Sequence, residues 1–147
     1  MVVLPQSDLE DRLKHYIEGF RNRHGLDESE AEGNVITLMV KPGIVLAVLA
    51  TAREHLQILH LSYITVVDRE GSFELTYEIL DLRGVSVRVK TTIEGEEPVI
   101  DTVTGIYPTA NWHEREAYDM FGVAFKGHPD LRRVYMWQDH FDHHPLL

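Results

Sequence analysis

Three segments in the middle of the chain are rich in β-branched and aromatic residues and are separated by short turns. They lie at residues 63–67, 73–80 and 85–92, with turn-forming residues at 68–72 and 83–84. This pattern is typical of consecutive strands that form a meander. In the third segment Val85, Val87 and Val89 alternate with polar residues. We therefore expect one face of the sheet to be covered and the other face to contact water.

Two helices and one strand are expected before this meander. Ser7 and Glu10 fit a capping box at the start of the first helix, and apolar residues follow at spacings of three and four. A strand is expected at 34–40 and a second helix at roughly 44–59, with the acidic segment 25–33 as a solvated loop. The residues predicted to face the core are Leu9, Leu13, Tyr16, Ile17 and Phe20 in the first helix, and Val45, Val48, Leu49, Leu56 and Leu59 in the second.

The order of these elements indicates the fold class. Helices and one strand come early, the strand meander follows, and a short edge segment at 98–103 precedes a last helix. We expect an α+β domain of two layers, with helices on one face of a mostly antiparallel sheet and an extended C-terminal tail. The whole chain, 1–147, is expected to be a single domain, and its motif region is 110–147.

Composition and charge disfavour several functions. The formal net charge of −10 opposes non-specific binding to nucleic acid or anionic lipid. The absence of cysteine excludes thiolate nucleophiles and cysteine-ligated iron–sulfur or zinc sites. No stretch approaches the roughly 20 apolar residues of a membrane span, and the apolar N-terminus is too short for a secretory leader. We expect a cytoplasmic protein without nucleic-acid partners and without direct membrane insertion.

The segment 110–122 carries the densest mixture of charge, aromatic residues and helix-ending signals. Asn111 and Glu114 have the spacing of a capping box, and Gly122 is placed to end the helix in a left-handed conformation. We predict a short helix that displays Glu114, Arg115, Glu116 and Asp119 on its surface, which would suit a protein partner.

Other chemistry for this region is less consistent with the residues. The histidines His128, His140, His143 and His144, with Asp139 and Asp142, are an alternative divalent-metal site. The acidic residues of the helix lack a nucleophile beside them, so general acid–base catalysis is not favoured. Arg132 and Arg133 are better suited to carboxylates of a neighbouring subunit than to nucleic acid. We expect no enzymatic activity of the isolated chain.

Two motifs in the last third resemble the signature of the 30-kDa subunit of respiratory complex I, the family of the C subunit of bacterial NADH:quinone oxidoreductase. Related subunits occur in energy-converting, membrane-bound nickel–iron hydrogenases. The matching residues are Trp112, Glu114, Arg115, Glu116, Asp119, Phe121 and Gly122, then His128, Pro129, Asp130, Arg132 and Arg133, and finally His144 and Pro145. His143 stands where glycine is usual. From the short C-terminal end we expect a hydrogenase-type member, with a cropped piece of a longer respiratory subunit as the alternative.

The resemblance implies an accessory subunit without a redox centre of its own. A protein of this kind docks beside the large catalytic subunit, of the 49-kDa or hydrogenase-large type, and near ferredoxin-like or small iron–sulfur subunits. Iron–sulfur clusters and the quinone or nickel–iron site are then expected in those partners, and none in this chain. The motif residues named above become candidate interface residues, at the cytoplasmic face of the membrane. The alternative is an independent domain that binds protein or metal through its histidine-rich tail.

Overall fold

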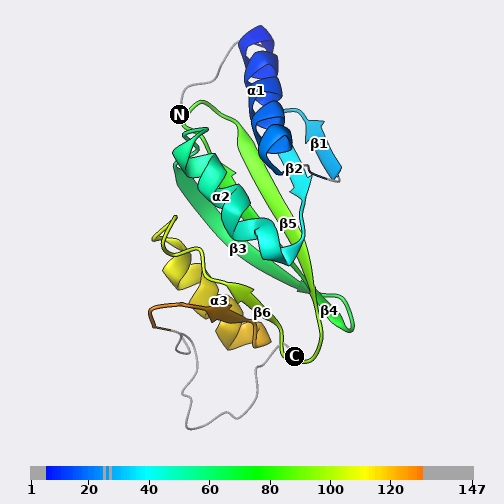
Figure 1. The fold of residues 1–147 in the computed structure, drawn as a ribbon, viewed down its shortest axis with the longest axis vertical. Coiled ribbons are helices and arrows are strands. Elements are labelled where there is room, and N and C mark those ends of the chain that lie inside the picture. Colours follow the sequence, from blue (N-terminus) through cyan, green and yellow to red (C-terminus); the bar gives the residue numbers. More distant parts are fainter. Residues whose placement is uncertain (1–5, 25, 27, 131–147) are drawn as a thin grey trace.

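The computed structural model describes residues 6–24, 26 and 28–130 (Figure 1). Within these residues the helices are α1 (Gln6–His24), the short 3-10 helix η1 (Pro42–Ile44), α2 (Val45–Glu54) and α3 (Ala110–Phe121). The strands are β1 (Glu28–Glu32), β2 (Val35–Met39), β3 (His60–Asp68), β4 (Ser72–Leu80), β5 (Ser86–Glu94), β6 (Val99–Asp101) and β7 (Ala124–Lys126). The predicted C-terminal tail lies outside the described residues.

The main sheet has five strands in the order β1-β2-β5-β4-β3. The meander of β3, β4 and β5 is antiparallel, as predicted, and β1 pairs with β2 in the same way. Only the pair of β2 and β5 in this sheet is parallel. The mostly antiparallel sheet expected from the sequence is therefore confirmed.

One face of this sheet carries the core. The register brings Ile36 beside Val87, and Val89 beside Tyr77, so these side chains share a face. Helices α1 and α2 lie across this face (Figure 1), with Phe20 and Leu49 completely buried. The rings of Phe73 on β4 and Phe121 on α3 meet edge to face at 6.2 Å, which places α3 on the same side. The two-layer α+β architecture with helices on one face is confirmed.

The opposite face of the sheet is polar. Glu78 accepts hydrogen bonds from Ser86 and Arg88, and the Arg88–Glu78 ion pair measures 3.1 Å. The ammonium group of Lys90 lies 3.9 Å from Glu74 on the neighbouring strand. The alternation that the sequence predicted for β5 is therefore present, with its valines in the core and these polar side chains opposite.

Two of the predicted elements are wrong, and a third forms a strand but pairs outside the main sheet. The acidic segment expected as a loop contains β1, an edge strand held by backbone pairing to β2. Helix α2 ends at Glu54, because the chain turns through Gln57 at a positive φ of 58° before entering β3. Leu59 is consequently half exposed, whereas Leu56 stays buried beyond the helix end. The predicted edge segment forms β6, which pairs in parallel with β7 in a separate two-stranded sheet.

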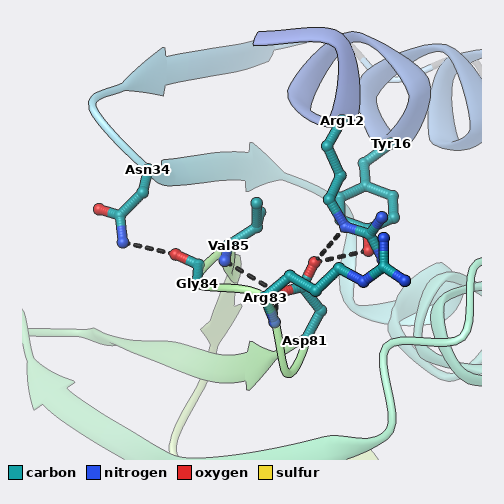
Figure 2. A network of polar contacts seen from close by, with 7 residues as sticks. All are labelled: Arg12, Tyr16, Asn34, Asp81, Arg83, Gly84 and Val85. Carbon is teal, nitrogen blue, oxygen red and sulfur yellow. Dashed lines mark hydrogen bonds and ion pairs between the residues drawn. The ribbon is translucent and has the colours of Figure 1, made fainter. Parts of the chain in front are cut away.

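A buried carboxylate ties α1 to the turn between β4 and β5 (Figure 2). Asp81 accepts hydrogen bonds from the guanidinium of Arg12 at 2.6 Å and from the hydroxyl of Tyr16 at 2.7 Å. Its other oxygen accepts the backbone N–H groups of Arg83 and Val85. This network closes the turn and fixes the first helix on the sheet. None of the helices described here is long and apolar enough to span a membrane.

Candidate docking surface on the third helix

Helix α3 begins without the predicted capping box. It starts at Ala110, so Asn111 lies inside the helix and cannot be its cap. The first backbone N–H groups instead donate to carbonyl groups of the preceding turn. The N–H of Ala110 donates to the carbonyl of Tyr107, and the N–H of Asn111 donates to the carbonyl of Pro108. The predicted helix end is confirmed, since Gly122 has a left-handed φ of 78° and donates its N–H to the carbonyl of Tyr118.

Two of the acidic residues predicted to be displayed are buried. The side chains of Glu114 and Asp119 are both completely inaccessible. Glu114 accepts hydrogen bonds from the hydroxyl of Thr102 at 2.6 and 2.9 Å and from the N–H of Val103 at 2.8 Å. Glu114 is buried and not displayed because the segment after β6 lies against the first turns of α3 and supplies donors that a sequence pattern does not reveal.

Burial dominates the electrostatics of Glu114. It raises the pKa of this carboxyl to about 7, although the hydrogen bonds from Thr102 and Val103 act in the opposite direction. A buried charge is costly unless an opposite charge compensates it. None of the ion pairs of the described residues includes Glu114. Its role is therefore to join two parts of the domain and not to display charge.

The accessible face of α3 is partly aromatic. Trp112 is 49% exposed, and the guanidinium of Arg115 lies 5.6 Å from the centre of its ring. Within the described part of the chain, the buried Nε atom of Arg115 has no hydrogen-bond partner. Arg115 and Glu116 are both partly accessible. An exposed tryptophan stacked on arginine is the kind of anchor that protein interfaces use.

A shallow groove runs beside this helix face, between α3 and the edge strand β3. Its volume is about 340 Å³. The groove is lined by Ile64, Thr65, Val66, Glu116, Ala117, Met120 and Phe121. It is too open and too poor in polar groups to suggest a catalytic pocket, and it places Glu116 and Met120 of α3 beside apolar residues of β3.

The turn after β7 is organised by His128. Its Nδ1 atom accepts the N–H of Asp130 at 2.9 Å, so its other nitrogen, Nε2, is the donor to the carbonyl of Asn111 at 3.2 Å. Gly127 precedes it with a positive φ of 85°. Both ring nitrogens of His128 are occupied, which disfavours this residue as a metal ligand. The described residues contain no cluster of three potential metal ligands.

The structure thus brings together the part of the motif up to Asp130. Trp112, Arg115, Glu116 and Phe121 lie on or beside the accessible face of α3, while Pro129 and Asp130 follow in the adjoining turn. The predicted interface residues Arg132, Arg133, His144 and Pro145, and the other tail histidines, lie outside the described residues. Sequence reasoning missed Ile64 and Val66 as neighbours of the motif, because only the folded sheet places β3 beside α3.

A family model described as the 30-kDa subunit of respiratory-chain NADH dehydrogenase matches residues 38–147. The chain belongs to this family. The match covers the meander of β3, β4 and β5 and the motif helix α3, so the resemblance based on the motifs is confirmed.

Curated relatives agree with this assignment. The C2 subunit of the NADH-quinone oxidoreductase of Rhizobium etli is 37% identical, over 92% of this chain and 70% of its own length. The corresponding C subunit of Geotalea uraniireducens is 39% identical, over 80% of this chain and 74% of its own length. Other matches span less of the relative, such as 36% of the C2 subunit of Rhizobium meliloti.

Two solved structures share the fold. A trypsin-resistant fragment of Nqo5 superposes with a TM-score of 0.69 at 28% identity, covering 82% of this chain and 99% of the fragment. A chain of an archaeal membrane-bound sulfane sulfur reductase, a respiratory membrane complex, superposes with a TM-score of 0.77 at 24% identity. That alignment covers 85% of this chain and 76% of the other chain, and it supports the fold alone.

Proposed function

We propose that this chain is a non-catalytic accessory subunit of a membrane-associated redox complex. In this proposal it braces the large catalytic subunit beside the iron–sulfur electron path, as a peripheral part of the complex at the cytoplasmic face. The redox cofactors then belong to the partner subunits. The names of the curated relatives favour an NADH:quinone oxidoreductase over a hydrogenase as the parent complex.

The observation that carries this proposal is the family match over the same residues that form the accessible face of α3. Trp112, Arg115 and Glu116, together with the groove against β3, provide an aromatic and charged surface suited to a protein partner. The turn at Pro129 and Asp130 precedes the motif arginines Arg132 and Arg133 in the sequence.

Copurification from the native host tests the proposal. The tagged chain is expected to bring with it a large catalytic subunit and iron–sulfur subunits, identified by mass spectrometry. The α3 variant, which carries both Trp112→Ala and Glu116→Lys, is expected to reduce this recovery strongly. An interface anchor contributes about 2 kcal/mol, which corresponds to roughly 30-fold in Kd.

A matched control is available at the other end of the sheet. Leu82 is 74% exposed in the turn between β4 and β5. This turn contacts α1 through the Arg12–Asp81 bond and lies away from α3 (Figure 1). Leu82→Ala is expected to leave recovery unchanged. Both variants must melt at the temperature of the natural chain. Recovery of no companion subunits, or equal recovery with the α3 variant, would count against the proposal.

A further inference from the structure

Glu114 is the side chain that joins α3 to the segment following β6. Its carboxyl group accepts the N–H of Val103, at 2.8 Å, and the hydroxyl of Thr102. Helix α3 also rests on the apolar contacts of its buried face. The polar attachment of the first turns of α3 to residues 102–104 therefore depends on the state of one completely buried carboxyl group.

A short chain of hydroxyl groups leads from this carboxyl group toward solvent. The hydroxyl of Thr102 lies 3.0 Å from that of Thr104, and the N–H of Thr104 also donates to Thr102. Both threonines are partly accessible. Because hydroxyl groups both donate and accept, this arrangement is compatible with either protonation state of Glu114.

Among the described residues, the groups around Glu114 form no ion pair with it. On β4 the phenol of Tyr77 is completely buried, and burial together with the charges of Glu114 and Asp101 raises its pKa, so it stays neutral. β3 turns Ile64 and Val66 toward α3. The remaining titratable groups are Asp101 on β6 and Lys126 on β7, both exposed, His128 in the following turn, and His113, Arg115, Glu116, Tyr118 and Asp119 on α3 itself.

We propose that Glu114 is a pH-sensitive latch that fastens the first turns of α3 to residues 102–104 when protonated and loosens them when ionised. The proton comes from solvent. In the protonated state the carbonyl oxygen of the side chain accepts the N–H of Val103, and its hydroxyl donates to Thr102. In the ionised state a full negative charge is buried without an ion-pair partner, and opening of the segment allows water to solvate it.

The direction of the effect follows from linkage. The pKa of Glu114 is about 7 in the closed state, where burial raises it, and returns toward its ordinary value of 4.5 when the segment opens. The closed state therefore binds more protons between these two values, and opening becomes more favourable as pH rises through this window. Above both values the opening equilibrium is constant. The device goes beyond the proposed function, because it depends only on this chain.

Amide hydrogen exchange on the full 147-residue chain tests the latch. The opening equilibrium at the N–H of Val103, corrected for the intrinsic exchange rate, is expected to rise about tenfold between pH 6 and pH 8. Glu114→Gln keeps the size and hydrogen-bonding capacity of the side chain and removes its titration, so exchange should then be independent of pH. Glu78→Gln, on the opposite face of the sheet, should retain the tenfold change.

A direct titration keeps the test valid if Glu114→Gln fails to fold. Carbon-13 NMR of the Glu114 carboxyl group in the natural chain is expected to give a midpoint near 7. A midpoint near 4.5, the ordinary value, would overturn the latch, as would corrected exchange at Val103 that does not change between pH 6 and pH 8. Since no partner subunit takes part, failure here leaves the copurification result untouched.

Discussion

At the residue scale, two buried carboxylates have pKa values shifted in opposite directions, because their hydrogen-bond and ion-pair partners differ. Burial alone would raise the pKa of Asp81, but the hydrogen bonds from Arg12, Tyr16 and the turn together hold it below its ordinary value. Glu114 forms no ion pair with a described residue, and burial raises its pKa. Asp81 therefore contributes stability that is lost as pH falls through its depressed pKa, whereas ionised Glu114 destabilises the fold as pH rises toward 7.

Removing the Asp81 carboxylate is expected to destabilise the domain. In Asp81→Ala the guanidinium of Arg12, the hydroxyl of Tyr16 and two backbone N–H groups lose their acceptor at once. Because Asp81 is 3% exposed, water can replace these bonds only in part. We expect the free energy of unfolding to fall by about 3 kcal/mol, measured by urea denaturation at pH 7.

The neighbouring acid Asp11 provides the matched control. It precedes Arg12 on α1 and is exposed. Asp11→Ala is expected to change the free energy of unfolding by no more than about 0.5 kcal/mol. Equal destabilisation by both substitutions would show that general charge, and not the Asp81 network, determines the effect.

At the scale of the element, α3 is defined by its ends and by what lies against it. The sequence correctly predicted its C-terminal stop, because glycine is strongly favoured in the left-handed conformation that Gly122 adopts. It misidentified the N-terminal cap, because two backbone carbonyl groups replaced the side chain of Asn111. Local patterns thus predict a helix boundary best where the backbone itself restricts the residue type.

Replacing Gly122 with alanine is expected to strain this helix end. At a φ of 78° a Cβ atom approaches the following carbonyl group, so the substitution should cost about 1 kcal/mol in the free energy of unfolding. Gly105→Ala is the control, since its Cβ would meet nothing within 4 Å and its φ is not left-handed. Thermal unfolding of the two variants compares them, and equal melting temperatures would contradict the prediction.

At the scale of the whole molecule, the hydrophobic periodicity of the sequence predicted the two layers. The features that depend on backbone pairing between strands were not predicted. The alternating valines of β5 indicated that one face of the sheet is covered, and this pattern was enough to predict the two-layer architecture. The acidic residues of β1 do not predict a strand, because the conformation of this segment is determined by its backbone pairing with β2. Likewise, the burial of Glu114 arises from Thr102 and Val103, which reach it only through the β6–β7 pairing and the following turn.

The position of the described core in the sequence predicts the behaviour of a chain that ends at Asp130. Tyr16, Leu49, Tyr77 and Phe125, from α1, α2, β4 and β7, already belong to one core cluster. A 1–130 chain is expected to unfold in a single cooperative transition, measured by circular dichroism. It should recover at least about tenfold less of the companion subunits, because Arg132 and Arg133 are proposed contacts. Full recovery of the companion subunits would show that residues 131–147 do not contribute to the interface. Loss of cooperative unfolding would show that these residues contribute to the core.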